Sequence, residues 1–83
     1  MNISYIEEED YILNYLIERN LLNQYKKVKK FLLIWNSRQV DFKLKKPKSA
    51  QIYYFRINQQ FRALCHFEWN VLVVFKIDNH QNK

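Results

Sequence analysis

The chain has 83 residues, of which 48% are hydrophobic, so we expect a single domain over residues 1–83 with a modest core. Lysine and arginine number 14 against 8 aspartate and glutamate residues, a net charge of +6 that favours an anionic partner, either nucleic acid or an acidic protein segment. Cys65 is the only cysteine, which excludes a disulfide framework and a cysteine-based metal site. Acidic residues stand where a signal peptide would be apolar, and no stretch is long enough to span a membrane. We therefore expect a cytoplasmic protein with no cofactor, no metal and no membrane partner.

The first half of the chain has the pattern of two helices. A short strand is expected over residues 2–6, and the acidic residues 7–10 stand where negative charge favours a helix N-terminus. The first helix should end near Glu18, because Asn20 interrupts the helical spacing. From Leu21 to Trp35 apolar residues recur at intervals of three and four, which predicts an amphipathic second helix with its lysines facing away. A solvated polar face explains these lysines more simply than contact with phosphates, although both interpretations stay open.

Apolar and basic residues alternate from Phe42 to Lys45, as they would on a strand with one solvated face. Pro47 cannot donate a hydrogen bond to a sheet ladder, so this strand should end there or lie at the edge of the sheet. Lysines on an edge strand protect it against aggregation, and the same lysines would also add to a binding site for an anion. The segment by itself favours neither interpretation.

Three antiparallel strands are predicted over residues 52–57, 61–67 and 71–77, which are rich in aromatic and β-branched residues. A three-residue loop after the first strand would place Arg56 opposite Arg62, and a second three-residue loop, Glu68 to Asn70, would place Arg62 opposite Lys76. The three cations would then form one row on the sheet. Like charges placed opposite each other destabilise a sheet, so the row indicates a bound polyanion such as a nucleic-acid backbone.

The predicted order is that of an α+β fold in which two N-terminal helices pack on one face of a small, mainly antiparallel sheet. Odd-numbered residues of the last three strands are almost all apolar and should form the core beneath the helices. They are Tyr53, Phe55, Ile57, Phe61, Ala63, Cys65, Phe67, Val71, Val73, Phe75 and Ile77. The even-numbered residues would carry the basic row on the other face. Because glycine is absent, Asn58 and Asn70 are expected to supply the backbone conformations of the turns.

The second half of the chain carries a leucine-lysine strand, an arginine-bearing hairpin and a histidine-containing end. The stretches are residues 44–47 (Leu-Lys-Lys-Pro), 54–64 (Tyr-Phe-Arg-Ile-Asn-Gln-Gln-Phe-Arg-Ala-Leu) and 73–80 (Val-Val-Phe-Lys-Ile-Asp-Asn-His). In this order they resemble the RelE/ParE superfamily of toxins from bacterial toxin–antitoxin systems, and most closely the RelE-branch members of YoeB type. The resemblance implies a RelE/ParE-like fold, a ribosome with bound messenger RNA as the target, and a cognate antitoxin protein as the partner.

The resemblance also implies a chemistry: metal-independent cleavage of messenger RNA in the ribosomal A site, by attack of a ribose 2′-hydroxyl on the adjacent phosphate. His80 would act as general acid or base, and Arg62 and Arg56 would hold the phosphate bidentately. The resemblance and the charge pattern together assign RNA binding to Lys43, Lys45, Lys46 and Lys76. The chain would be a toxin that inhibits translation as an endoribonuclease, or mRNA interferase.

The resemblance does not identify the general base. YoeB-like relatives pair the histidine with a glutamate, whereas here Gln81 follows His80 and the nearest acids are Asp78 and Asp41. Two other functions stay open: a ParE-like inhibitor of DNA gyrase without catalytic activity, and a non-toxic relative that only binds its antitoxin. Only the nuclease requires His80, so the substitution His80→Ala distinguishes it from both alternatives.

Overall fold

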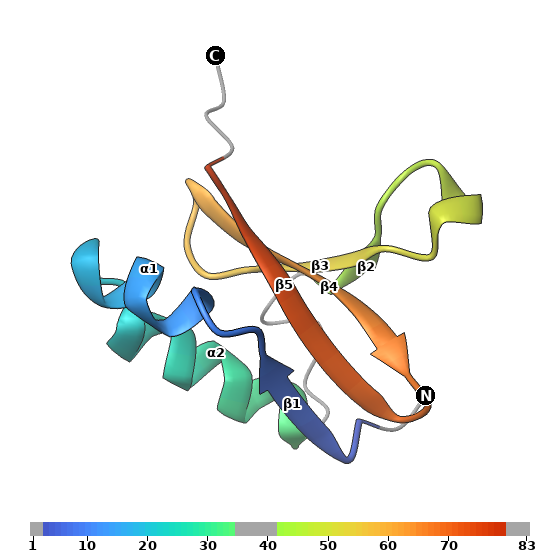
Figure 1. Cartoon of the computed structure of the whole chain (residues 1–83), viewed down its shortest axis with the longest axis horizontal. Coiled ribbons are helices and arrows are strands. Elements are labelled where there is room, and N and C mark those ends of the chain that lie inside the picture. Colours follow the sequence, from blue (N-terminus) through green and yellow to red (C-terminus); the bar gives the residue numbers. More distant parts are fainter. Residues whose placement is uncertain (1–2, 35–41, 80–83) are drawn as a thin grey trace.

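The computed structural model describes residues 3–34 and 42–79. Its elements are β1 (Tyr5–Glu8), α1 (Ile12–Glu18), α2 (Leu22–Leu33), β2 (Lys43–Leu44), the 3₁₀ turn η1 (Lys48–Ala50), β3 (Tyr53–Arg56), β4 (Phe61–Glu68) and β5 (Val71–Asn79). The strands form one sheet in the order β1-β5-β4-β3-β2, in which β1 runs parallel to β5 and the other pairs are antiparallel. Both helices lie on the same side of this sheet (Figure 1). The predicted α+β class is therefore confirmed.

The two helices follow the predicted spacing, but neither helix has an acidic residue in its first turn. Helix α1 ends at Glu18 as expected, and Asn20 adopts the left-handed conformation, with φ of 57°. Glu7 and Glu8 belong instead to β1, and no acidic residue lies in the first turn of α1. The prediction holds only for Glu9 and Asp10, which lie just before the N-cap residue Tyr11, because Glu7 and Glu8 extend the strand that carries the buried Ile6. Within the described ranges, neither helix is long and apolar enough to cross a bilayer.

The hydrophobic core lies between the helices and the sheet. Helix α2 contributes Tyr25 and Leu32, as its periodicity predicts; Trp35, the last residue of that pattern, lies outside the described residues. The ring of Tyr25 packs 6.1 Å from the ring of Phe55 on β3. The other buried members of the core are Ile3, Ile6, Ile12, Leu16, Leu21, Ile57, Ala63, Cys65, Leu72, Val74 and Ile77.

The hairpin between β3 and β4 has the predicted register. Arg56 pairs with Arg62 across the two strands. Asn58 holds the connecting loop, because its side-chain oxygen accepts hydrogen bonds from the backbone amides of Gln60 and Phe61, both at 2.8 Å. An asparagine side chain that accepts a hydrogen bond from the backbone amide two residues later closes a turn as a backbone carbonyl would. Asn58 therefore forms this turn through its side chain and not through the backbone conformation that was predicted, because its φ is not positive.

The hairpin between β4 and β5 differs from the prediction in two places. Glu68 pairs with Val71, so the turn has two residues in place of three, and Trp69, not Asn70, takes the positive φ of 60°. A β-bulge between Leu64 and Cys65 shifts the pairing by one further residue. For β4 residues up to Leu64, the two shifts together move the partner on β5 by two positions. The predicted pairing of Arg62 with Lys76 is therefore wrong.

The shorter turn changes which residues of β5 enter the core, and the bulge reverses the change. Between the turn and the bulge, Leu72 and Val74 are fully buried beneath the helices, where Val71 and Val73 were expected. A shift of one residue exchanges the two faces of a strand. Past the bulge the predicted alternation returns, and Ile77 joins the core.

The remaining strand, β2, pairs only with β3 and forms one edge of the sheet. Its two residues end before Pro47, as the absence of an amide hydrogen on proline requires. The expectation of an edge strand at this point is confirmed.

Candidate polyanion-binding face

One face of the sheet is turned away from the helices and carries most of the predicted cations. Residues next to one another on a strand point to opposite faces, and Phe55, Ala63 and Ile77 enter the core. Their neighbours therefore lie on the other face, which we call the open face. It comprises Lys43, Tyr54, Arg56, Arg62, Lys76 and Asp78.

Arg62 is the most tightly held cation of the open face. Its Nε donates a hydrogen bond to Oδ2 of Asp78 at 3.2 Å, and its Nη2 donates to the same oxygen. The guanidinium carbon also lies 4.8 Å from the centre of the Tyr54 ring. The Arg62 side chain is only 13% exposed and that of Asp78 is 29% exposed. The ion pair and the ring together fix the direction of the guanidinium before any ligand arrives.

Arg56 stands directly opposite Arg62 on the neighbouring strand. The Cβ atoms of such opposite residues are about 5 Å apart. The Nη1 of Arg56 donates a hydrogen bond to the carbonyl oxygen of Gln59 at 3.3 Å. The order across the three strands is therefore Arg56, Arg62 and Asp78, two cations followed by an anion. Asp78 offsets the repulsion that the two arginines would otherwise exert on each other.

The predicted RNA-binding lysines are only partly brought together. Lys43 is exposed and pairs with Tyr54, and Lys76 is exposed and pairs with Leu64, so both share the open face with Arg62. Lys45 is half-buried and lies just beyond β2, where its amide donates to the carbonyl oxygen of Ile52. Lys46 is exposed in the loop before η1. The structure thus places Lys43 and Lys76 beside the arginines, with Lys45 and Lys46 on the adjoining loop.

The predicted catalytic histidine, His80, lies outside the described residues, as do Asp41 and Gln81. Asp78, the other candidate for the general base, is placed two residues before His80 in the chain and bonds directly to Arg62. The structure therefore describes the cationic part of the predicted site and one of its two candidate bases.

Two contacts at this site did not enter the predictions from sequence. The ring of Tyr54 lies under Arg62, and the register of the first hairpin already places these two residues diagonally on one face. No feature of the sequence predicts the ion pair between Arg62 and Asp78, because this pair depends on the bulge between Leu64 and Cys65. No glycine marks that bulge in the sequence.

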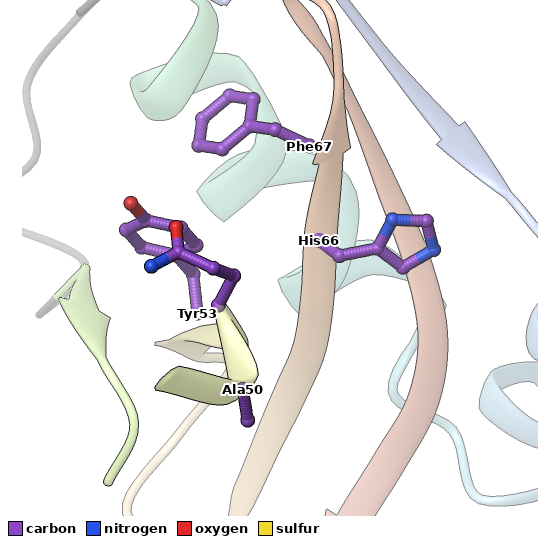
Figure 2. Close-up of a pocket in the computed structure, with 5 residues that line it drawn as sticks. Ala50, Tyr53, His66 and Phe67 are labelled. Atoms are coloured by element: carbon purple, nitrogen blue, oxygen red, sulfur yellow. The ribbon is translucent and has the colours of Figure 1, made fainter. Parts of the chain in front are cut away.

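A separate cavity of about 520 Å³ lies where β3 begins, lined by Ala50, Gln51, Tyr53, His66 and Phe67. Figure 2 shows that His66 points to the side of β4 opposite Tyr53 and Phe67. His66 pairs with Val73, and its ring packs 5.6 Å from that of Phe75. Its Nε2 lies 3.9 Å from a carboxylate oxygen of Glu68.

On the helix side of the sheet, one carboxylate holds β1 to α2. Oε2 of Glu8 accepts hydrogen bonds from the hydroxyl of Tyr25 at 2.6 Å and from Nζ of Lys29 at 2.9 Å. Burial, and then the bond to Glu8, raises the pKa of Tyr25 well above its ordinary value. Burial likewise raises the pKa of the Cys65 thiol. Both groups are therefore neutral and structural at ordinary pH.

Comparison with known proteins adds no relative: no protein-family model matches the chain, and no curated protein matches it. Within residues 3–34 and 42–79, no three histidine, cysteine or acidic residues lie close enough together to hold a metal ion. What the described site offers chemically is therefore a pair of guanidinium groups, additional lysines and one carboxylate on an exposed sheet face.

Proposed function

We propose that this chain is the toxin of a type II toxin–antitoxin system, with a RelE/ParE-like fold and the activity of a ribosome-dependent mRNA endonuclease. The observation that carries the proposal is the placement of Arg56 directly opposite Arg62 on the open face. Two guanidinium groups side by side cost stability on a bare protein surface, and a phosphate between them would convert that cost into binding energy. A cognate antitoxin would cover the same charges when the toxin is silent.

The reaction requires a base, an acid and stabilisation of the charge on phosphorus. The base removes the proton of the ribose 2′-hydroxyl, the 2′ oxygen bonds to phosphorus, and the bond from phosphorus to the 5′ oxygen breaks. The acid protonates the leaving 5′ oxygen, so the products are a 2′,3′-cyclic phosphate and a 5′-hydroxyl. In our proposal His80 carries one of the two proton transfers, and the arginines stabilise the developing negative charge.

The ion pair with Asp78 supports this assignment in one respect. Transition-state stabilisation is most effective where the donors are oriented beforehand, because no energy is then spent on arranging them during the reaction. Arg62 is oriented by Asp78 and by the ring of Tyr54. Asp78 also supplies a carboxylate beside the phosphate-binding arginines, where a general base would be needed. In this proposal Asp78 positions Arg62 and is the described candidate for the base.

The same ion pair also favours a second candidate function. Asp78 already neutralises Arg62, which leaves less positive charge for a phosphate than the sequence suggests. A ParE-like toxin that inhibits gyrase by binding alone would tolerate this, because it would use the open face for contact and not for catalysis. A non-toxic relative that only binds its antitoxin would tolerate it equally.

The discriminating experiment is expression of the wild-type chain and of His80→Ala without antitoxin. The nuclease predicts growth arrest by the wild type only, while both proteins retain the same circular dichroism and bind the antitoxin. Growth arrest by both proteins, together with loss of DNA supercoiling by gyrase, would favour the ParE-like function. No arrest by either protein would favour the non-toxic relative.

A further inference from the structure

Helix α2 carries positive charge without any negative charge of its own. Its 12 residues include four lysines and no acidic residue. Lys29 is accounted for, because its Nζ bonds to Glu8 on β1. Lys26, Lys27 and Lys30 are exposed, and none of the three pairs with a carboxylate in the part of the chain that the structure describes. These three residues form what we call the α2 lysine face.

The α2 lysine face points directly away from the sheet. Successive residues of a helix are rotated by roughly 100°, so the three lysines fall within an arc of about 100°. Tyr25 and Leu32 occupy the opposite side of the helix and are buried in the core. The contact between Lys29 and Glu8 on β1 is independent evidence for which side of α2 faces the sheet.

The arrangement differs from an ordinary solvated helix face. Exposed faces usually mix both signs of charge, which allows favourable pairs at a spacing of four residues. Here Lys26 and Lys30 have that spacing and the same sign, so they repel each other. None of the eight acidic residues of the chain, four of which are residues 7–10, belongs to the sequence of α2.

We propose that the α2 lysine face binds the phosphate backbone of folded RNA, as a second polyanion contact on the side of the molecule opposite the open face. The helix layer and the core separate the two surfaces, in a fold that measures 30 × 27 × 25 Å. One nucleic-acid segment cannot cover both, so the chain bridges two segments. The choice of RNA as the occupant rests on the proposed function. In that function a messenger RNA lies on the open face, and a folded RNA contacts the α2 lysine face.

The test is the salt dependence of binding to a short fluorescent RNA duplex, for the wild type and for Lys26→Gln/Lys27→Gln/Lys30→Gln. Each phosphate contact contributes roughly 0.7–0.9 to the slope of log affinity against log salt concentration. We expect the slope to fall by about 2–3 in this variant. The matched control is Lys26→Arg/Lys27→Arg/Lys30→Arg, which keeps the charge and should keep the slope. The three side chains are exposed, so both variants should fold as the wild type does.

A second variant tests whether two separate surfaces are involved. Because one short duplex contacts only one surface at a time, Arg56→Gln/Lys76→Gln should leave binding at the α2 lysine face unchanged, and combining it with the glutamine variant of α2 should abolish binding at both surfaces. An unchanged slope in the α2 glutamine variant would overturn the inference, as would an equal fall in the arginine control. Loss of binding to a polyglutamate peptide with no loss for the duplex would assign the face to an acidic protein instead. The duplex binding does not involve cleavage, so this result and that of the His80→Ala experiment can fail separately.

Discussion

Arg62 on β4 and Asp78 on β5 form an ion pair in which two nitrogens of one guanidinium donate to a single carboxylate oxygen. The pair lies next to Arg56, so the open face holds a row of two cations and one anion. Asp78 therefore has two effects that can be separated by experiment: it stabilises the fold, and it lowers the attraction of the open face for a phosphate.

The substitution Asp78→Asn should lower stability and raise RNA affinity together. It removes the negative partner of a largely buried arginine, and a hydrogen bond to a charged group contributes about 1.5–3 kcal/mol. We expect the free energy of unfolding in urea to fall by about 1–3 kcal/mol, while the affinity for single-stranded RNA rises. The control is Asp10→Asn, which makes the same change of charge at an exposed position. A gain in affinity as large in the control would show that net charge, and not the ion pair, governs binding.

Stability should decrease on the alkaline side, because burial raises the pKa of both Cys65 and Tyr25. In the unfolded chain a thiol ionises near pH 8.5 and a phenol near pH 10. The folded pKa of each group is higher than the unfolded one, so the contribution is complete below the unfolded value and is lost as the pH rises above it. The free energy of unfolding of the wild type should therefore decline from about pH 8.5 upward.

Variants identify which group is responsible. In Cys65→Ala the decline of the free energy of unfolding between about pH 8.5 and pH 10 should become shallower. The smaller side chain lowers this free energy by the same amount at every pH, so it does not change the slope. In Tyr25→Phe the decline above about pH 10 should become shallower. Denaturant unfolding at a series of pH values gives both slopes. Identical slopes in wild type and variants would contradict the burial that the structure assigns to these groups.

Trp69 should be replaceable with a gain in stability. Its side chain is 97% exposed, and its backbone has a φ of 60°, which is unfavourable for a residue with a bulky side chain. Asparagine adopts this conformation more easily, so Trp69→Asn should raise the free energy of unfolding by about 0.5–1 kcal/mol. Asn70→Asp, at the neighbouring turn residue without a positive φ, should change it little. A loss of stability in Trp69→Asn would mean that the indole ring makes a stabilising contact.

The register of the first hairpin could be predicted from sequence because its determinants are local. The loop of residues 58–60 is short, and Asn58 bonds to the amides that close it. The pairing of Arg56 with Arg62 depends on nothing further away. The helices were equally predictable, since the apolar spacing of α2 reflects the burial of Tyr25 and Leu32.

The second hairpin could not be predicted because its register depends on interactions distant in the sequence. Placing Leu72 under the helices requires the neighbouring strand β1, which pairs Ile6 with Leu72 in parallel. A two-residue turn satisfies this constraint, and the bulge then returns Ile77 to the core. The partner of Arg62 changes from Lys76 to Asp78 as a result. The sequence thus predicted which cations share the open face, but not the carboxylate that partly neutralises them.

The central claim is tested most directly by mapping the 5′ ends of messenger RNA on purified translating ribosomes, with the wild-type chain, with His80→Ala and with free message as the control. The account predicts new ends within the A-site codon, each with a 5′-hydroxyl, only in the presence of ribosomes and only with the wild type. A message left intact by the wild-type chain on ribosomes, or cut equally well by His80→Ala, would contradict it.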